Sequence, residues 1–256
     1  MSLNPAQLQQ FKIDGYLVLS DLLADQQIQQ LRALTETHLK QRREPLELES
    51  EVNYPGAPVS REAEGGATIR RLRSAYQRDP LYRDLAQHPL VAEAIRQILT
   101  CEQLLLNPSH HNCIMTKQPA YSSATLWHRD TRYWHFDNKY LINAWFALGN
   151  ELPDNGAMQI LPGSHRWEIQ EDALDEAQFL KPDHPFNQDR MATARTVALQ
   201  AGDVVLFSAH CFHAAGKNMT DRSKYSVVFT YHGATTKPLP GTPSASQPEI
   251  PVVTPG

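Results

Sequence analysis

Two histidine positions and an aspartate in this chain have the residue types and spacing of a divalent metal site. His128 and Asp130 lie two residues apart, so on one strand they face the same side and present an imidazole and a carboxylate to one point. About eighty residues later, the apolar run 202–208 leads to a distal histidine, His210 or His213. Two ligands from one strand end and one distant histidine form the facial arrangement typical of non-haem Fe(II) oxygenases. Without that context, a His-x-Asp pair also fits two polar residues on a solvent-facing strand.

An arginine stands just before the last strand that the sequence predicts. The residues after His213 are rich in turn formers and lead to the alternating run 224–232. Arg222 lies at the start of this run. A guanidinium that faces into a barrel there can form a bidentate pair with the remote carboxylate of a dicarboxylic cosubstrate. The competing interpretation makes Arg222 a surface residue at a strand start.

Helices are predicted to come first along the chain. A short helix is expected to begin at Asn4-Pro5 and to end near Gly15, because Pro suits the first helical position and Gly the end. Apolar residues at helical spacing predict two more helices, one from Asp25 and one that follows the cap-and-proline signal at Asp79-Pro80 and ends near Leu99. Residues 42–70 show no sustained period, so we expect a long loop there.

Short strands are predicted to follow. The apolar or alternating runs that indicate them are 103–106, 112–116, 140–148, 157–161, 194–199, 203–208 and 224–232. Helices followed by short strands argue for an α+β chain with flanking N-terminal helices and a double-sheet barrel or jelly roll. We expect one domain over 1–236, with a helical flank over 1–100 and a barrel core over about 101–236. The proline-rich tail, 237–256, is expected to be disordered or to follow the surface.

The composition is that of an ordinary globular chain and argues against several classes of partner. The 256 residues carry 24 basic and 28 acidic side chains, so the chain lacks the basic footprint that phosphate-backbone binding needs. No run approaches the roughly 20 apolar residues that span a bilayer, and the N-terminus lacks the features of a signal peptide. Three scattered cysteines indicate reduced thiols. We expect a cytoplasmic protein that binds a small molecule; the sequence does not indicate its oligomeric state.

Five motifs follow one another along the chain: Lys117-Gln118-Pro119, Trp127-His128-Arg129-Asp130, 155–165 with its Pro-Gly-Ser-His end, 202–207 and 213–218. Together they resemble the phytanoyl-CoA dioxygenase family of Fe(II)- and 2-oxoglutarate-dependent oxygenases. The resemblance implies a double-stranded β-helix, with iron held by His128, Asp130 and His213. It also implies that 2-oxoglutarate chelates the iron, that its far carboxylate meets Arg222, and that dioxygen is consumed.

The resemblance also separates the two candidate distal histidines. His213 precedes the Gly-x-Asn segment near which the family's distal ligand lies, whereas His210 is expected to hydrogen-bond nearby or to face solvent. Lys117 matches a family lysine that can assist 2-oxoglutarate, although a lysine on a strand edge is often simply solvated. Thr125, three residues before His128, is a lesser candidate for a cosubstrate hydrogen bond.

The segment behind the metal motif bears on the substrate. Trp134-His135 resembles the ectoine hydroxylase branch of the family, whose substrate is a small polar solute. His135, Trp145 and Arg132 are therefore candidates for a substrate pocket, although Trp145 equally fits core packing and Arg132 a surface charge. His110-His111 are adjacent, so on a strand their rings point to opposite faces and do not share a metal.

Specificity is expected to come from the irregular segment 42–70 and from the excursion 166–193, because loops at a barrel mouth vary while the scaffold stays fixed. His165, in the excursion's preceding Pro-Gly-Ser-His stretch, is expected to shape a loop beside the site. Four arginines can hold an anionic substrate or remain solvated: Arg61, Arg70, Arg71 and Arg73. Acyl-CoA, an amino acid derivative and a secondary metabolite all stay open as substrates.

The prediction for function is a hydroxylase. Such an enzyme couples the decarboxylation of 2-oxoglutarate to hydroxylation of an unactivated C–H bond of a small molecule, with release of succinate and CO2. Two other classes stay open on the residues alone. A zinc-dependent hydrolase could use the same three ligands to activate water, and a cupin-like binding protein would keep the barrel without turnover.

Overall fold

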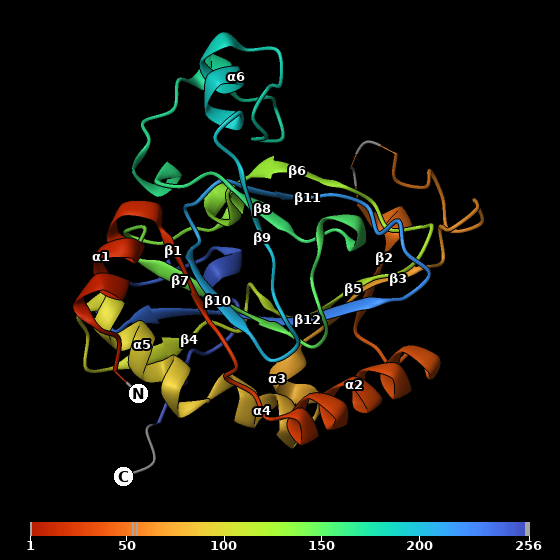
Figure 1. Ribbon diagram of the computed structural model, residues 1–256, viewed down its shortest axis with the longest axis horizontal. Helices are drawn as coiled ribbons and strands as arrows, with labels where there is room; N and C mark the ends of the chain where they lie inside the picture. Colours follow the sequence, from red (N-terminus) through yellow and green to blue (C-terminus); the bar gives the residue numbers. More distant parts are fainter. Residues whose placement is uncertain (1, 53, 55, 254–256) are drawn as a thin grey trace.

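Two antiparallel sheets face each other at the centre of the molecule (Figure 1). The structure, a computed structural model, describes residues 2–52, 54 and 56–253. The larger sheet contains β1 (Tyr16–Leu19), β2 (Leu46–Leu48), β3 (Ile69–Arg73), β4 (Leu104–Leu106), β5 (Asn112–Lys117), β7 (Leu141–Ala147), β10 (Val204–Ser208), β12 (Lys224–Gly233) and β13 (Ile250–Pro251). The smaller sheet contains β6 (Thr125–His128), β8 (Met158–Ile160), β9 (Arg195–Val197) and β11 (His213–Ala215).

The strand order is that of a double-stranded β-helix. The larger sheet runs β1-β10-β7-β12-β5-β3-β2, with β4 pairing with β12 and with β13, and the smaller sheet runs β6-β11-β8-β9. Apart from the pairs β2–β3 and β8–β9, neighbours in each sheet are non-consecutive along the chain, so segments distant in sequence are brought together. This arrangement confirms the predicted α+β fold with a jelly-roll core.

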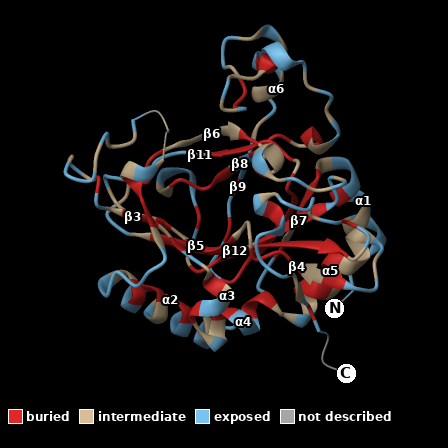
Figure 2. Ribbon diagram, turned by 180° about the vertical axis from the view of Figure 1, so that it is seen from behind, coloured by how far each residue is buried: buried red, intermediate tan, exposed pale blue. Residues whose placement is uncertain are grey.

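The helices of the N-terminal flank pack against the outer face of the larger sheet (Figures 1 and 2). They are α1 (Pro5–Asp14), α2 (Asp25–Lys40), α3 (Ala75–Arg78), α4 (Pro80–Ala86) and α5 (Pro89–Leu99). As predicted, the side chain of Asn4 caps the first helix, and Gly15 ends it in the left-handed region that favours glycine, at φ +78°. A short α6 (Pro185–Met191) lies apart from them, in the excursion 166–193.

The two faces of the long strand β12 differ in character: one is apolar and packs against the helices, and the other carries polar side chains near the site. Val227 and Phe229 are fully buried in the apolar core shared with the helices, and burying such a side chain stabilises the fold by about 1.5–3 kcal/mol. Ser226 and Thr230 have the opposite parity and hydrogen-bond polar side chains of the neighbouring β7 region. The side chains that build the site therefore belong to the face turned toward the smaller sheet.

Two features of the helical flank differ from the prediction. The segment expected to be a loop contains β2 and part of β3, which extend the larger sheet beyond β5. These short strands carry Glu47, Arg71 and Arg73, which form ion pairs with one another. Charged residues therefore stand where an apolar pattern would have indicated strands. The helix that ends near Leu99 is separate from the one that starts at Pro80, because Pro89 begins a new helix.

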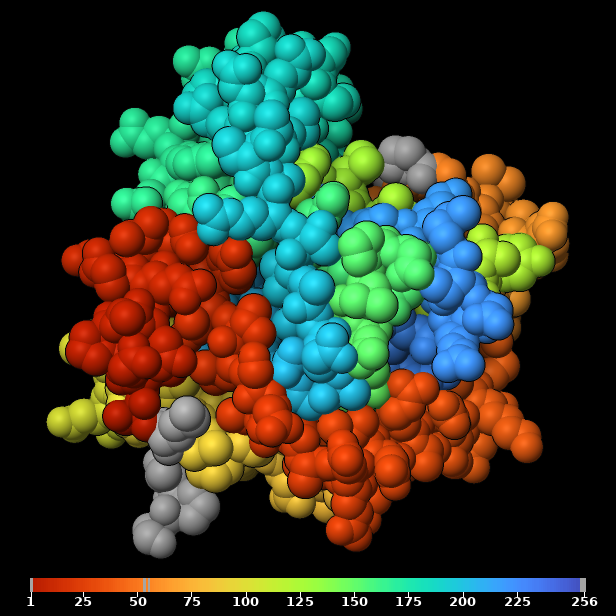
Figure 3. Space-filling view, viewed as in Figure 1, coloured from red at the N-terminus to blue at the C-terminus, as the bar shows by residue number. Residues whose placement is uncertain are grey.

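Two further segments lie outside the central strands: the excursion 166–193 and the tail that begins at residue 237. The excursion forms a lobe that projects from the barrel, coloured green to cyan at the top of Figure 3. The described part of the tail, 237–253, is ordered: Pro238 bridges to Phe136, and β13 pairs with β4. These residues follow the surface, which is one of the two alternatives expected for the tail, while 254–256 lie outside the described residues. None of the described helices has the length and apolarity that crossing a bilayer requires.

Candidate active site

Three potential metal ligands converge between the two sheets. His128 ends β6 and His213 begins β11, and the two residues are partners in the register of these strands. The Nε2 atom of each histidine lies 3.6 Å from Oδ1 of Asp130, and the ligand atoms of the three buried residues lie within 4.8 Å of one another. Two imidazoles and one carboxylate at these separations suit one divalent ion of the first transition row.

Backbone carbonyls orient both imidazoles. Nδ1 of His128 lies 2.8 Å from the carbonyl oxygen of Leu126, and Nδ1 of His213 lies 3.1 Å from that of Cys211. A ring that donates its Nδ1–H to a carbonyl carries a lone pair on Nε2, which is the tautomer of a metal ligand. Burial also lowers the pKa of His213 to about 4, which keeps this ring neutral. The donor set therefore fits a transition-metal ion such as iron.

Asp130 reaches the same point by a route that differs from the prediction. β6 ends at His128, and Asp130 begins a 3₁₀ helix over Asp130–Tyr133, so strand alternation does not set its direction. Its Oδ2 accepts a hydrogen bond of 2.6 Å from Nδ2 of Asn143, whose Oδ1 accepts one of 2.6 Å from the hydroxyl of Thr230. This buried chain holds one carboxylate oxygen and leaves Oδ1 facing the two histidines.

A further histidine contacts the site, and sequence reasoning missed it. Nε2 of His111 lies 2.9 Å from Oδ1 of Asp130. Burial alone would raise the pKa of Asp130, but His111 and His213 hold it well below the usual carboxyl range. The His110-His111 pair gives no signal of this contact, because the residue before β5 and the 3₁₀ helix that begins at Asp130 meet only in the folded chain.

His210, the other distal candidate, lies outside the cluster. Its Nδ1 is 2.9 Å from the hydroxyl of Thr131, and its Nε2 is 3.1 Å from Nη1 of Arg129. The structure thus brings His213, and not His210, to Asp130.

A narrow cavity of about 80 Å³ adjoins the three ligands inside the barrel. We call it the inner cavity. Apolar side chains such as Met158 and Phe207 line much of it, together with Lys117 of β5 and Lys224 of β12, which are partners in the sheet register. Lys224 is buried and Lys117 is half-buried, and a few charged side chains in a mostly apolar cavity are typical of a small-molecule site.

Lys224 is a buried cation that sequence reasoning overlooked. It is 5% exposed, and its Nζ lies 2.7 Å from Oε2 of the fully buried Glu151. The same carboxylate accepts hydrogen bonds from the indole N–H of Trp145 and the hydroxyl of Ser226. Trp145, a candidate for the substrate pocket, instead lines the inner cavity.

Lys117, a predicted cosubstrate residue, is held by carbonyl oxygens. Its Nζ donates to the carbonyl of Ser123 at 3.1 Å and to that of Gly216. Burial lowers the pKa of Lys117 to about 7, and the nearby Lys224 and Arg70 cations contribute in the same direction. Lys117 therefore gains or loses its proton near neutral pH.

Arg222 lies outside the inner cavity. Its side chain is exposed in the turn before β12, which begins at Lys224. Asn218 closes this turn, since its Nδ2 donates to the carbonyl oxygens of Arg222 at 2.7 Å and Lys117 at 2.8 Å. The alternation of β12 does not extend into the turn, so the expectation that Arg222 faces into the barrel is wrong.

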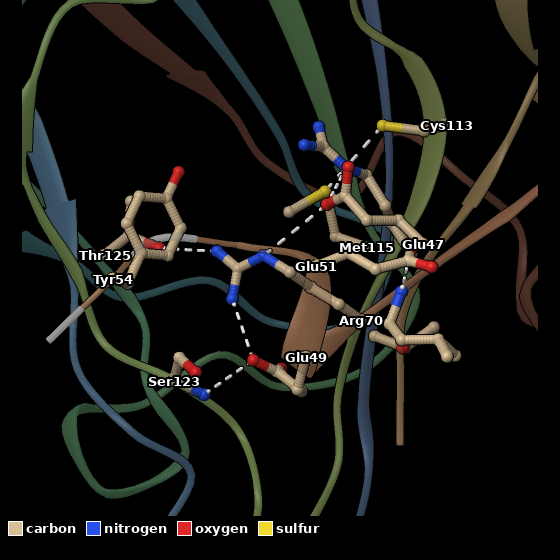
Figure 4. Close-up of polar contacts among 12 residues, drawn as sticks. Glu47, Glu49, Glu51, Tyr54, Arg70, Cys113, Met115, Ser123 and Thr125 are labelled. Carbon is tan, nitrogen blue, oxygen red and sulfur yellow. Dashed lines mark hydrogen bonds and ion pairs between the residues drawn. The ribbon is translucent and has the colours of Figure 1, made fainter. Parts of the chain in front are cut away.

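Thr125 and Arg70 border the inner cavity on another side (Figure 4). Nη2 of Arg70 donates to the hydroxyl of Thr125 at 2.9 Å, and Nη1 donates to Glu49 at 3.2 Å. The ring of Tyr54 lies 4.7 Å from the guanidinium carbon. Arg70 is thus a buried, ion-paired residue, whereas Arg61 is exposed.

A second and larger space, about 500 Å³ in volume, lies on the other side of His128 and Asp130. We call it the outer cavity. Its walls come from the 3₁₀ helix at 130–133, the residues after it, the segment 108–113 and the β2–β3 edge. Trp134 stacks on His110 in this wall, with ring centroids 4.4 Å apart and planes inclined by 16°.

The tail supports the wall of the outer cavity. The hydroxyl of Ser244 is 2.7 Å from Nε2 of His110 and accepts a hydrogen bond of 2.8 Å from the backbone N–H of His135. The side chain of His135 itself is exposed. His165 is half-buried and is not among the residues that line either cavity.

Comparison with known proteins agrees with this architecture. Residues 11–226 match the phytanoyl-CoA dioxygenase (PhyH) family. The ectoine dioxygenase of Bordetella parapertussis is 24% identical over 251 residues, which cover 90% of this chain and 76% of that protein. The fold is shared by EctD from S. alaskensis, solved with 2-oxoglutarate and 5-hydroxyectoine, at a TM-score of 0.73 and 19% identity over 91% of this chain and 77% of that one.

A second solved structure shares the fold to a similar extent. It is the epimerase SnoN, solved with Fe3+, alpha-ketoglutarate and nogalamycin RO, at a TM-score of 0.71 and 22% identity over 93% of this chain and 92% of that one. The motif order, the barrel, the clustered ligands and the extent of the family match lead to one conclusion: this chain belongs to the phytanoyl-CoA dioxygenase family.

Proposed function

We propose that this protein is an Fe(II)- and 2-oxoglutarate-dependent dioxygenase that hydroxylates an unactivated C–H bond of a small molecule and releases succinate and CO2. The observation that carries the proposal is the pair of imidazoles whose Nδ1 atoms face backbone carbonyls while both Nε2 atoms turn to Asp130. Family membership supports the same reaction class, and relatives of the same fold were solved with iron and 2-oxoglutarate.

Three residues would hold the metal. His128, Asp130 and His213 would bind Fe(II), which supplies the activation of dioxygen when it is bound. The contacts behind these ligands restrict their movement, because two carbonyls hold the rings and Asn143 holds the carboxylate. Partners of this kind typically contribute about 10- to 100-fold to metal affinity.

The two lysines of the inner cavity would receive the distal carboxylate of 2-oxoglutarate. Lys224 is already paired with Glu151, so the carboxylate of a ligand adds a charge that protonated Lys117 can balance. The apolar side chains around them exclude water and strengthen these charge interactions. In this proposal Lys224 takes the role that the sequence assigned to Arg222.

The buried cations also separate the dioxygenase from its rivals. A zinc-dependent hydrolase needs the three ligands and a water but has no use for an anion site inside the barrel. A cupin-like binding protein would need the cavity without turnover. The dioxygenase uses both the ligands and the cations.

Succinate formation tests the proposal. Purified protein is incubated aerobically with Fe(II), ascorbate and 2-oxoglutarate, with a parallel sample in which Zn(II) replaces Fe(II). We expect 2-oxoglutarate-dependent succinate in the Fe(II) sample only, at a slow uncoupled rate when no prime substrate is added. Metal-loaded protein that binds 2-oxoglutarate but forms no succinate would favour the binding protein, and ester or amide cleavage with Zn(II) would favour the hydrolase.

A further inference from the structure

A guanidinium in the wall of the outer cavity has poorly satisfied donors. Arg132 is half-buried and lines this cavity together with His128 and Asp130. Its Nη1 lies 3.4 Å from the carbonyl oxygen of Ala177 and its Nη2 lies 3.5 Å from the hydroxyl of Tyr54. Both contacts are long for hydrogen bonds, and a guanidinium offers five N–H donors. Within the part of the chain that the structure describes, no carboxylate forms an ion pair with Arg132.

Aromatic rings hold this guanidinium near the metal ligands. Its carbon atom lies 4.2 Å from the ring centre of Phe179 and 4.8 Å from that of Tyr133. Phe179 in turn lies edge-on to the ring of His128, with centroids 6.0 Å apart. Phe179 thus contacts both Arg132 and a proposed iron ligand, and the two rings beside the guanidinium reduce the hydration of the cation.

The other charged groups of the outer cavity are already paired. Arg71 and Arg73 both contact Glu47, at 2.6 and 2.5 Å. Asp130 faces the histidine cluster, where a metal would balance its charge. Arg132 is the charge in this wall for which the described residues supply no counterpart, so the outer cavity has room and charge for an anionic group.

We propose that Arg132 binds a carboxylate of the prime substrate, and that this substrate is a small carboxylic acid of amino-acid or similar size. The proposal rests on the proposed function, because it places the reacting C–H bond between Arg132 and the metal. A planar carboxylate matches the fork of a guanidinium in bidentate geometry and gives a charge-assisted pair. Arg132 and His128 both contact the ring of Phe179 and both line the outer cavity, so a small acid is long enough to reach from the guanidinium to the metal ligands.

Matched pairs of acids and amides test this proposal. Each small acid, beginning with L-proline, is compared with its carboxamide, L-prolinamide, for binding to the anaerobic Fe(II)- and 2-oxoglutarate-loaded protein by calorimetry. Succinate release above the uncoupled rate is the second readout, and acyl-CoA thioesters form a third arm. We expect at least one acid to bind and to stimulate release while its carboxamide does neither.

The variant Arg132→Gln assigns the effect to the guanidinium. We expect it to weaken binding of the active acid by about tenfold to a hundredfold, as for loss of a charge-assisted hydrogen bond. Arg132→Lys keeps the positive charge but not the planar guanidinium, so its affinity for the acid should lie between those of wild type and Arg132→Gln. This variant replaces Arg132→Gln in the test if the Gln variant does not fold. Arg222→Gln, an exposed arginine outside both cavities, is the matched control and should bind the acid as wild type does.

Several results would overturn the inference. They are equal binding of acid and amide, an unchanged acid affinity in Arg132→Gln, stimulation by acyl-CoA thioesters alone, and no response to any acid in the library. A wild-type protein that forms no succinate at all would instead contradict the proposed function, and calorimetry with the acids would still report on Arg132.

Discussion

The inner and outer cavities meet at His128 and Asp130, yet they are built from different kinds of structure. Paired strands form most of the inner cavity, and its cations Lys224 and Arg70 lie against buried carboxylates. Turns and a 3₁₀ helix form most of the outer cavity, to which the tail adds Gln247, and Arg132 has only long hydrogen-bond contacts there. Sheet hydrogen bonds fix the side chains that every turnover would use, whereas loops supply the surface that can differ with the substrate. The following predictions test this division.

Loss of the Asp130 carboxylate, which lines both cavities, should abolish metal binding and turnover together. Asp130→Ala leaves two imidazoles, so we expect iron affinity and succinate formation to fall by more than about a hundredfold, beyond the usual cost of losing a ligand's supporting partner. Iron content after dialysis and the succinate rate measure the effect. His210→Ala is the control and should retain iron and most activity; if it lost iron while His213→Ala kept it, the assignment of the distal ligand would be wrong.

Loss of Lys224 should affect the inner cavity alone. Lys224→Ala removes one of the two lysines proposed to receive the distal carboxylate of 2-oxoglutarate and leaves Glu151 as an unpaired negative charge beside it, so we expect the dissociation constant to rise by about thirtyfold or more. Calorimetry with anaerobic, iron-loaded protein measures it, and Lys224→Arg should recover part of the affinity because it keeps the ion pair with Glu151. Arg222→Ala is the matched control. Equal dissociation constants for wild type and Lys224→Ala would refute the placement of 2-oxoglutarate.

The binding of 2-oxoglutarate should depend on pH through Lys117. Its pKa is lowered to about 7, so the free lysine loses its proton as the pH rises through this value. A bound carboxylate favours the protonated form, and affinity should therefore fall above pH 7, by up to about tenfold per pH unit. Calorimetry in buffers of different ionisation enthalpy should detect proton uptake on binding. Lys117→Met should abolish this uptake; if the variant keeps it, another group is responsible.

Loss of the Ser244 hydroxyl should disturb only the outer cavity. Ser244→Ala removes the partner of His110 and of the His135 amide, which we expect to cost about 1–3 kcal/mol of folding stability. Thermal unfolding measures the stability, and calorimetry measures the affinities for 2-oxoglutarate and for the acid substrate separately. The affinity for 2-oxoglutarate should stay at the wild-type value. A large change in that affinity would show that the two cavities are not independent.

The same division explains how much of the molecule could be predicted from its sequence. The strands 203–208 and 224–232 are buried between layers, so their apolar or alternating patterns predict them. The residues His128, Asp130 and His213 carry a recognisable motif at the ends of such strands. The structure places these three residues in one cluster, as the sequence motifs predict.

Other parts of the site have no local pattern. β2 and β3 are stabilised by pairs between Glu47 and arginines, which appear in the sequence as a charged loop. The contacts of His111 with Asp130 and of Ser244 with His110 join segments through the fold, the latter across 134 residues. Arg222 lies in the turn closed by Asn218, and a period-two pattern does not show that this turn leaves its side chain exposed.

The two carbonyls that orient the iron-site imidazoles belong to the main chain of Leu126 and Cys211. Every amino acid supplies that oxygen, so a change of side chain at either position leaves the anchor in place. The metal geometry is in this respect robust to mutation. Laboratory evolution toward a new substrate can therefore vary the outer wall broadly, including Arg132 and Trp134, while the orientation of both histidine rings is inherited from the backbone.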